Sequence, residues 1–179
     1  MKIVTTPMCQ EILRLAGVSQ FQLVKDGDYG DADIAVVLSE TKIHENTSTK
    51  IIKLKLNTFN QIEDSIKLIS NILGTKPLKE DFNNQPANHR RDENRKIKVK
   101  THSHFLREIA KDMGFTVVTD DSYDFLIYPD YLGKELEKEL HEAGGRAIEL
   151  SSHGNAPQNP VKRAEMRYQI LENNICMKH

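Results

Sequence analysis

The hydrophobic pattern of the first 75 residues predicts strands that alternate with helices. Strand-like composition occurs in four short runs, at residues 2–6, 21–24, 34–38 and 51–56. Apolar residues recur at helical spacing in two further segments, from Pro7 to Gly17 and from Ile62 to Leu73. The run 34–38 is apolar throughout, which is typical of a strand buried on both faces of a parallel sheet.

The same order of elements recurs after residue 95. Strands are predicted at residues 97–100, 115–118, 125–128 and 147–150, and helices at residues 105–113, 134–143 and 161–172. Residues 76–95 are rich in Asn, Pro and charged residues, which predicts a linker or crossover loop. We therefore expect an α/β fold, with a mainly parallel sheet flanked by helices. Two similar β-α-β-β halves are expected, at residues 1–75 and 96–179, and these can also pack as one domain.

Charge and hydropathy narrow the class of protein. The chain has 25 Lys and Arg against 26 Asp and Glu, a net charge of -1, which gives no electrostatic reason to expect nucleic acid as a partner. No apolar run approaches the roughly 18 residues of a membrane span, and the first residues have the pattern of a strand rather than of a signal peptide. We therefore expect a cytoplasmic protein that binds neither nucleic acid nor membrane.

Cys9 is the first candidate for a reactive residue. It follows a predicted strand, and Pro7 and the preceding threonine have the composition of a helix start, so Cys9 is expected as the third helical residue. The positive end of a helix favours a thiolate over a thiol, and ligands of open α/β sheets bind at the carboxyl ends of the strands. The competing interpretation is a small buried hydrophobic side chain, because free cysteine is among the most buried residue types.

Polar turns after two strands of the second half form another candidate site. His102 and His104 follow the strand predicted at 97–100, and His153 follows the strand predicted at 147–150. Asp130 is expected to lie near these histidines. Their spacing matches no established metal motif, so no metal is expected. The accompanying Ser, Thr, Asn and Gly residues are better suited to hydrogen-bond a polar ligand or phosphate.

Cys176 is far from Cys9 in sequence, so neither a disulfide framework nor a structural zinc is indicated. We expect Cys176 to be incidental to the function.

The opening segment also carries a family resemblance. Residues 1–13, MKIVTTPMCQEIL, and the chain length resemble the HcgF family of methanogenic archaea, which helps to assemble the iron–guanylylpyridinol (FeGP) cofactor of Fe-hydrogenase. The resemblance implies an α/β fold and guanylylpyridinol, or its AMP ester, as substrate, with no tightly bound cofactor. It implies that a partner enzyme adenylates the carboxylate, and that a cysteine matching Cys9 captures it as a thioester, a precursor of the acyl-iron ligand.

Such an acyl transfer needs a thiolate, donors for the developing oxyanion and groups that orient the nucleotide. Cys9 supplies the first, and backbone N–H groups of the turn are candidates for the second. The expected ligand-binding residues lie in that turn or after neighbouring strands of the same sheet edge: Thr5, Thr6, Pro7, Met8, Gln10, Ser39, Thr41, Asn57 and Thr58.

Two other classes of function stay open. In one, the chain is a non-catalytic binding or scaffold protein in which Cys9 is only packed. In the other, it is a metal-dependent enzyme that uses His102, His104 and His153. Homo-oligomerisation is compatible with the sequence in every case.

Overall fold

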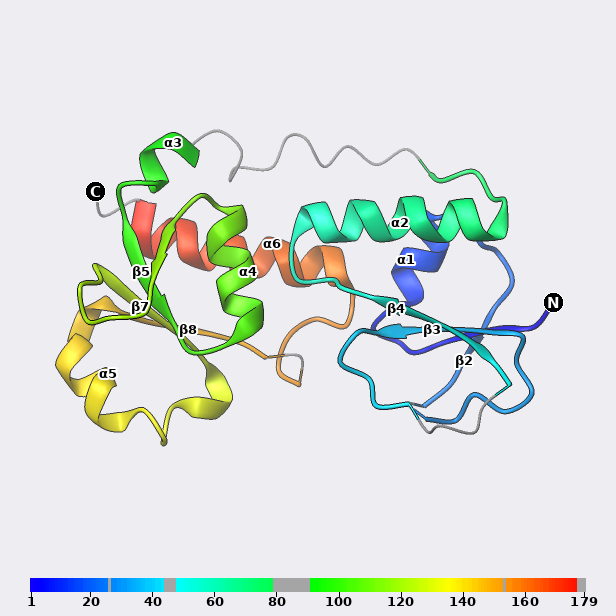
Figure 1. Ribbon diagram of the computed structural model, residues 1–179, viewed down its shortest axis with the longest axis horizontal. Coiled ribbons are helices and arrows are strands. Elements are labelled where there is room, and N and C mark those ends of the chain that lie inside the picture. Colours follow the sequence, from blue (N-terminus) through cyan, green and yellow to red (C-terminus); the bar gives the residue numbers. More distant parts are fainter. Residues whose placement is uncertain (26, 44–47, 79–90, 153, 177–179) are drawn as a thin grey trace. The chain divides into compact units, whose positions relative to one another are not determined.

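The structure is a computed structural model that describes residues 1–25, 27–43, 48–78, 91–152 and 154–176 (Figure 1). The chain divides into two compact units. One contains Met1–Phe82 and Gln158–Lys162, and the other contains Asn83–Pro157 and Arg163–His179. Most of the predicted linker at 76–95 lies outside the described residues.

The first unit is built on a parallel four-stranded sheet. Its strands are β1 (Ile3–Thr5), β2 (Gln22–Leu23), β3 (Ile34–Leu38) and β4 (Lys50–Leu54), in the order β2-β1-β3-β4. Thr5 is in register with Val36, and Val36 with Ile52. The chain leaves β1 towards β2 on one side, while β3 pairs with β1 on the other side. The carboxyl ends of β1 and β3 therefore form a topological switch point, where open α/β sheets bind ligands.

Two helices, α1 (Gln10–Leu15) and α2 (Phe59–Leu73), lie on the same side of this sheet (Figure 1). The buried face of α2 is formed mainly by isoleucines at helical spacing, Ile62, Ile66 and Ile69. On the other face, Tyr29 from a connecting segment packs with Val4 and Val37 of the strands. Both faces of the sheet are thus covered, which explains why β3 is apolar along its length.

The second unit repeats this topology. Its parallel strands are β5 (Lys98–Thr101), β6 (Thr116–Val118), β7 (Phe125–Pro129) and β8 (Ala147–Leu150), in the order β6-β5-β7-β8. Both units thus have an α/β fold with helices flanking a parallel sheet, as predicted. The switch point of the second sheet lies between the carboxyl ends of β5 and β7.

The helical elements of the second unit are α3 (Arg91–Asn94), α4 (His104–Asp112), η2 (Asp130–Leu132), α5 (Glu137–Ala143), η3 (Gly144–Arg146), α6 (Pro160–Leu171), whose first turn belongs to the first unit, and the π-helical η4 (Glu172–Cys176). The hydroxyl of Tyr168 on α6 donates to Asp112 at the end of α4, so these helices are neighbours. Lys100 on β5 forms an ion pair with Glu139 of α5, with 2.8 Å between the lysine Nζ and the glutamate Oε1.

The short helix α3 corrects the linker prediction at its C-terminal end. Asn94 is buried, and its side-chain amide donates to the carbonyl of Met113 at 2.8 Å. The guanidinium of Arg91 pairs with Asp112, with 3.2 Å between Nη2 and Oδ1. These contacts attach to the second unit a segment whose composition alone indicates a loop.

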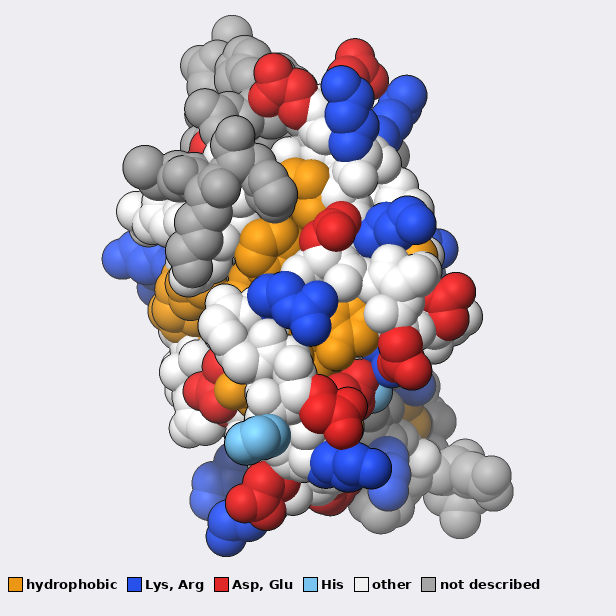
Figure 2. All heavy atoms as spheres, turned by 90° about the vertical axis from the view of Figure 1, so that its left-hand side faces the viewer, with side chains coloured by type: hydrophobic (Ala, Val, Ile, Leu, Met, Phe, Trp, Pro, Cys, Tyr) orange, Lys and Arg blue, Asp and Glu red, His pale blue; other side chains and the backbone are white. Residues whose placement is uncertain are grey.

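The face of the protein shown in Figure 2 carries both acidic and basic side chains, in agreement with the nearly equal numbers of the two in the sequence. On one face of the second unit, acidic and basic side chains are interspersed around a strip of hydrophobic side chains (Figure 2). Within the described ranges, no helix combines the length and the apolar character needed to cross a membrane.

Candidate functional site

Cys9 lies at the switch point of the first sheet, after the carboxyl end of β1. Residues 7–9 form a turn in which the Cys9 N–H donates to the Thr6 carbonyl at 3.0 Å. Helix α1 begins at Gln10, and Cys9 occupies the N-cap position with φ -107° and ψ -4°. The expectation that Cys9 is the third helical residue is therefore wrong, because the proline opens a separate turn rather than the helix.

The Cys9 side chain is fully buried, with 0% of its surface exposed, and it forms no disulfide. Its carbonyl accepts from the N–H of Ile12 at 3.1 Å, which fixes the residue against the first turn of α1. Since its own N–H is used by Thr6, that group is not available to an oxyanion in this conformation. The burial matches the interpretation of Cys9 as a packed hydrophobic side chain, and a nucleophilic role requires the sulfur to become accessible.

The other residues of this turn divide into buried and exposed ones. Thr5 is fully buried and its hydroxyl donates to the Val36 carbonyl on β3 at 2.8 Å. Thr6 is also buried, whereas Pro7 is exposed and two residues are partly exposed, Met8 and Gln10. The Thr5 hydroxyl thus already links two strands.

Ser39 and Thr41 follow the carboxyl end of β3. The backbone N–H of Ser39 donates to the Leu54 carbonyl at 2.8 Å, and that of Thr41 to the Leu38 carbonyl at 3.1 Å. The hydroxyl oxygen of Ser39 is buried and has no hydrogen-bond partner among the described residues. A buried hydroxyl without a partner is costly, so Ser39 has hydrogen-bonding capacity that a ligand can use.

Asn57 and Thr58 lie between β4 and α2, with Thr58 as the N-cap of α2, and both are buried. The Thr58 hydroxyl accepts from the N–H of Gln61 at 3.2 Å, and the Gln61 side chain accepts from the N–H of Asn57 at 2.9 Å. This reciprocal arrangement closely resembles a capping box, and it satisfies backbone donors at the helix start. Thr58 therefore has a structural role that does not depend on a ligand.

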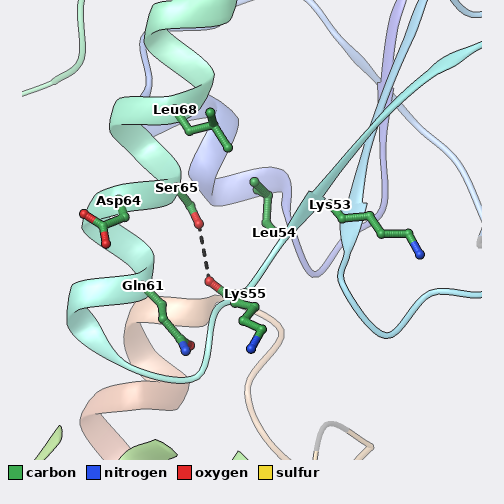
Figure 3. Close-up of a pocket in the computed structure, with 7 residues that line it drawn as sticks. All are labelled: Lys53, Leu54, Lys55, Gln61, Asp64, Ser65 and Leu68. Carbon is green, nitrogen blue, oxygen red and sulfur yellow. Dashed lines mark hydrogen bonds between the residues drawn. The ribbon is translucent and has the colours of Figure 1, made fainter.

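The predicted ligand-binding residues thus occupy the same edge of the first sheet, since Thr5 ends β1 and the others follow the carboxyl ends of β1, β3 and β4. A separate pocket of ≈ 250 Å³ lies between β4 and α2 in the same unit (Figure 3). In it, the Ser65 hydroxyl donates to the Lys55 carbonyl at 3.3 Å. Its lining includes none of the predicted residues: it consists of Lys53, Leu54, Lys55, Gln61, Asp64, Ser65 and Leu68.

In the second unit, Asp130 organises the turn after β8. Its carboxylate accepts from the backbone N–H of Ser152 at 3.0 Å and from the side-chain amide of Asn155 at 2.7 Å. Burial acts to raise the pKa of Asp130, but these hydrogen bonds outweigh it and hold the pKa below its ordinary range. Asp130 is therefore ionised at neutral pH, and the N–H groups of Ser152 and Asn155 in this turn stabilise its negative charge.

Two of the three histidines of the metal hypothesis contact different glutamates. His102 Nε2 is 2.8 Å from Glu139, and His104 Nδ1 is 3.4 Å from Glu108. His153 lies outside the described residues. Among the residues that the structure describes, no three His, Cys, Asp or Glu side chains are arranged to hold a metal ion.

Two residues that the sequence pattern does not single out are Arg163 and Arg167 on α6, both of which have 0% of their surface exposed. They are four residues apart, on the face that also carries the buried Tyr168 and Leu171. Both Nε and Nη2 of Arg167 donate to the Ser151 carbonyl, at 3.1 and 2.8 Å. Their burial could have been inferred from helical periodicity, because both arginines stand at positions of the apolar face of the helix. The composition of the segment alone does not indicate it.

Comparison with known proteins extends the description of the fold. No family model matches the chain, and no curated protein matches it in sequence. A mutant of the laminin-binding adhesin Lmb from Streptococcus agalactiae has a similar structure, with a TM-score of 0.52 and 9% identity over 98% of this chain and 99% of that chain. A Zn(II)-bound mutant of AdcAII from Streptococcus pneumoniae gives a TM-score of 0.49 and 11% identity, over 98% and 99% of the two chains. The first likeness supports the α/β fold of the chain.

Proposed function

We propose that this chain is a cytoplasmic cofactor-biosynthesis protein that binds guanylylpyridinol at the carboxyl edge of the first sheet and captures its adenylated carboxylate on Cys9. The observation that carries the proposal is the position of Cys9 in the turn that follows β1, one of the two strands that form the switch point. The resemblance of residues 1–13 to the HcgF family supplies the identity of the ligand and of the adenylating partner.

In the proposed reaction, the Cys9 sulfur attacks the acyl carbon of the acyl-adenylate. A carbon–sulfur bond forms, the bond from the acyl carbon to the phosphate oxygen breaks, and AMP leaves with that electron pair. The thiol proton passes to solvent or to the departing phosphate. The hydroxyl of Ser39, which directly follows β3 and has no hydrogen-bond partner among the described residues, hydrogen-bonds the ligand in this proposal.

Access to the sulfur is the physical requirement of this proposal. Because Cys9 has no exposed surface, the turn at residues 7–9 has to shift before an acyl group can reach it. The exposed Pro7 and the partly exposed Met8 belong to the segment that has to move. Binding energy from the nucleotide part of the ligand can offset the cost of such a shift.

The burial of Cys9 favours a second candidate function, a binding protein without catalysis. In that case the same sheet edge binds guanylylpyridinol, and the cysteine only fills space beneath the site. The two functions differ in what happens to an activated ligand, because a binding protein releases no AMP from it.

Release of AMP from adenylated guanylylpyridinol distinguishes the two functions. The wild-type chain and Cys176→Ala are expected to release one AMP per chain in a single burst, and Cys9→Ala none above the rate in buffer. Calorimetry with unactivated guanylylpyridinol checks that Cys9→Ala still binds. Binding by all three proteins without a burst from any of them supports the non-catalytic candidate instead.

A further inference from the structure

Arg167 has hydrogen-bonding capacity that the described residues do not use. Its Nε and Nη2 share the Ser151 carbonyl, whereas Nη1 is buried and has no hydrogen-bond partner among the described residues. In a planar guanidinium, Nη1 and the outer N–H of Nη2 form a second edge. That edge matches the spacing of two oxygens of a carboxylate or phosphate.

The Thr101 hydroxyl is a second unused group at the switch point. Thr101 ends β5, and its Oγ1 is buried without a hydrogen-bond partner in the described part of the chain. Its neighbours Lys100 and His102 both reach Glu139 of α5. Because side chains alternate along a strand, Thr101 faces the opposite side of the sheet.

Arg167 lies on that opposite side. Its guanidinium stacks on the ring of Phe105, 4.7 Å from the ring centre, and Phe105 belongs to the first turn of α4. The Ser151 carbonyl that it binds directly follows the carboxyl end of β8. The arginine, the threonine and the positive end of the α4 dipole thus lie on one face of the sheet, at its carboxyl edge.

The electrostatics of this edge favour an anion. Burial, together with the like charge of Arg163, lowers the pKa of Arg167 to about 10, and the opposite charge of Asp130 acts against both effects. Arg167 is still a cation at neutral pH, since guanidinium groups do not deprotonate there. A bound anion would offset the desolvation of this charge.

From these observations we infer that the carboxyl edge of the second sheet binds a small carboxylate or phosphate on the face covered by α4 and α6. Arg167 binds two oxygens of the anion through its Nη1 and Nη2 edge, and the Thr101 hydroxyl donates to the same group. The inference uses no property of Cys9, so it stands or fails separately from the acyl-transfer proposal.

Titration of the full chain with inorganic phosphate, and separately with acetate, tests this site by NMR of the arginine side-chain N–H groups. We expect one of the two anions to shift the Arg167 signals with a dissociation constant of about 1 mM or lower. Phosphate binding identifies a phosphate ligand, and acetate binding a carboxylate. No shift of the Arg167 signals with either anion would refute the inference.

Variants locate the site. Arg167→Lys keeps the charge but cannot make the bidentate hydrogen bonds of a guanidinium, so the affinity for the anion should fall about tenfold or more. Thr101→Val is nearly isosteric and removes a hydroxyl that has no hydrogen-bond partner among the described residues, so it should fold and bind about three- to tenfold more weakly. Arg146→Lys, at an exposed arginine before the amino end of β8, is the matched control and should bind as the wild type does. Should Arg167→Lys fail to fold, Thr101→Val decides, and unchanged affinity in that variant contradicts the assignment.

Discussion

At the scale of single residues, the hydroxyl groups at the first sheet edge differ in what they already bind. Thr5 links β1 to β3, and Thr58 caps α2. Ser39 has a buried hydroxyl without a partner among the described residues. Removal of each group should therefore have a different effect, although sequence analysis assigns all three the same role.

We predict that Ser39→Ala changes the free energy of unfolding by less than about 0.5 kcal/mol, because it removes no hydrogen bond within the described structure. It should weaken the binding of guanylylpyridinol about five- to tenfold. Thr58→Ala should instead lower the free energy of unfolding by about 1 kcal/mol, because it removes a helix cap. Urea unfolding and calorimetry measure the two effects, and a reversed pattern would show that Ser39 is structural.

Asp130 should make the stability of the protein depend on pH in acid. Its pKa is lowered in the folded state, so its stabilisation is fully present above the unfolded pKa of about 3.9 and is lost as pH falls through the folded pKa. Asp130→Asn should cost about 1–3 kcal/mol at pH 7, and the difference from the wild type should shrink below about pH 4. Urea unfolding across this range measures it. Asp92→Asn, at a side chain that is 91% exposed, should show no such trend.

Burial is the property of single residues that sequence predicted least well. The pattern correctly placed Cys9 after a strand, but it could not tell whether the sulfur faces the ligand edge or the core. The buried Arg163 and Arg167 were missed because arginine is exposed by default in any pattern-based analysis. Both errors arise because exposure depends on tertiary packing.

At the scale of elements, strongly patterned segments were predicted well. β3 and β8 have the bounds expected for them, since a short, mainly apolar run between polar or glycine-rich segments has few alternative structures. The start of α1 was misplaced by three residues because the hydrogen bond from Cys9 to Thr6 closes a turn first. Helix α3 was missed because its stability comes from contacts with Asp112 and Met113, which the local sequence does not show.

The glycines after α1 and α2 test how these elements are packed. Gly17 and Gly74 both have positive φ, +79° and +64°. A Cβ at Gly17 would lie 2.2 Å from the Lys76 carbonyl oxygen, whereas one at Gly74 has nothing within 4 Å. Gly74→Ala should cost about 1 kcal/mol from the backbone conformation alone, and Gly17→Ala about 1–3 kcal/mol more. Urea unfolding measures both, and equal costs would mean that residue 76 does not pack against α1.

At the scale of the whole molecule, the two units share one strand order, and each presents a switch point at the carboxyl edge of its sheet. The recurring pattern of the sequence predicted this repetition. It did not predict that residues 158–162 belong with the first unit, because a helix that begins in one unit and continues in the other has an uninterrupted local pattern. The chemistry proposed from the sequence is assigned to the first edge, whereas Arg167, whose Nη1 has no hydrogen-bond partner among the described residues, lies at the second.

The central claim is that Cys9 carries the acyl group, and intact-mass spectrometry after exposure to adenylated guanylylpyridinol tests it most directly. We predict one adduct with the mass of the acyl group on the wild type and on Cys176→Ala, removed by hydroxylamine and mapped by peptide analysis to Cys9. Cys9→Ala should carry no adduct while it still binds the unactivated ligand. A hydroxylamine-sensitive adduct on Cys9→Ala, or a wild type that binds the activated ligand and stays unmodified, would contradict the account.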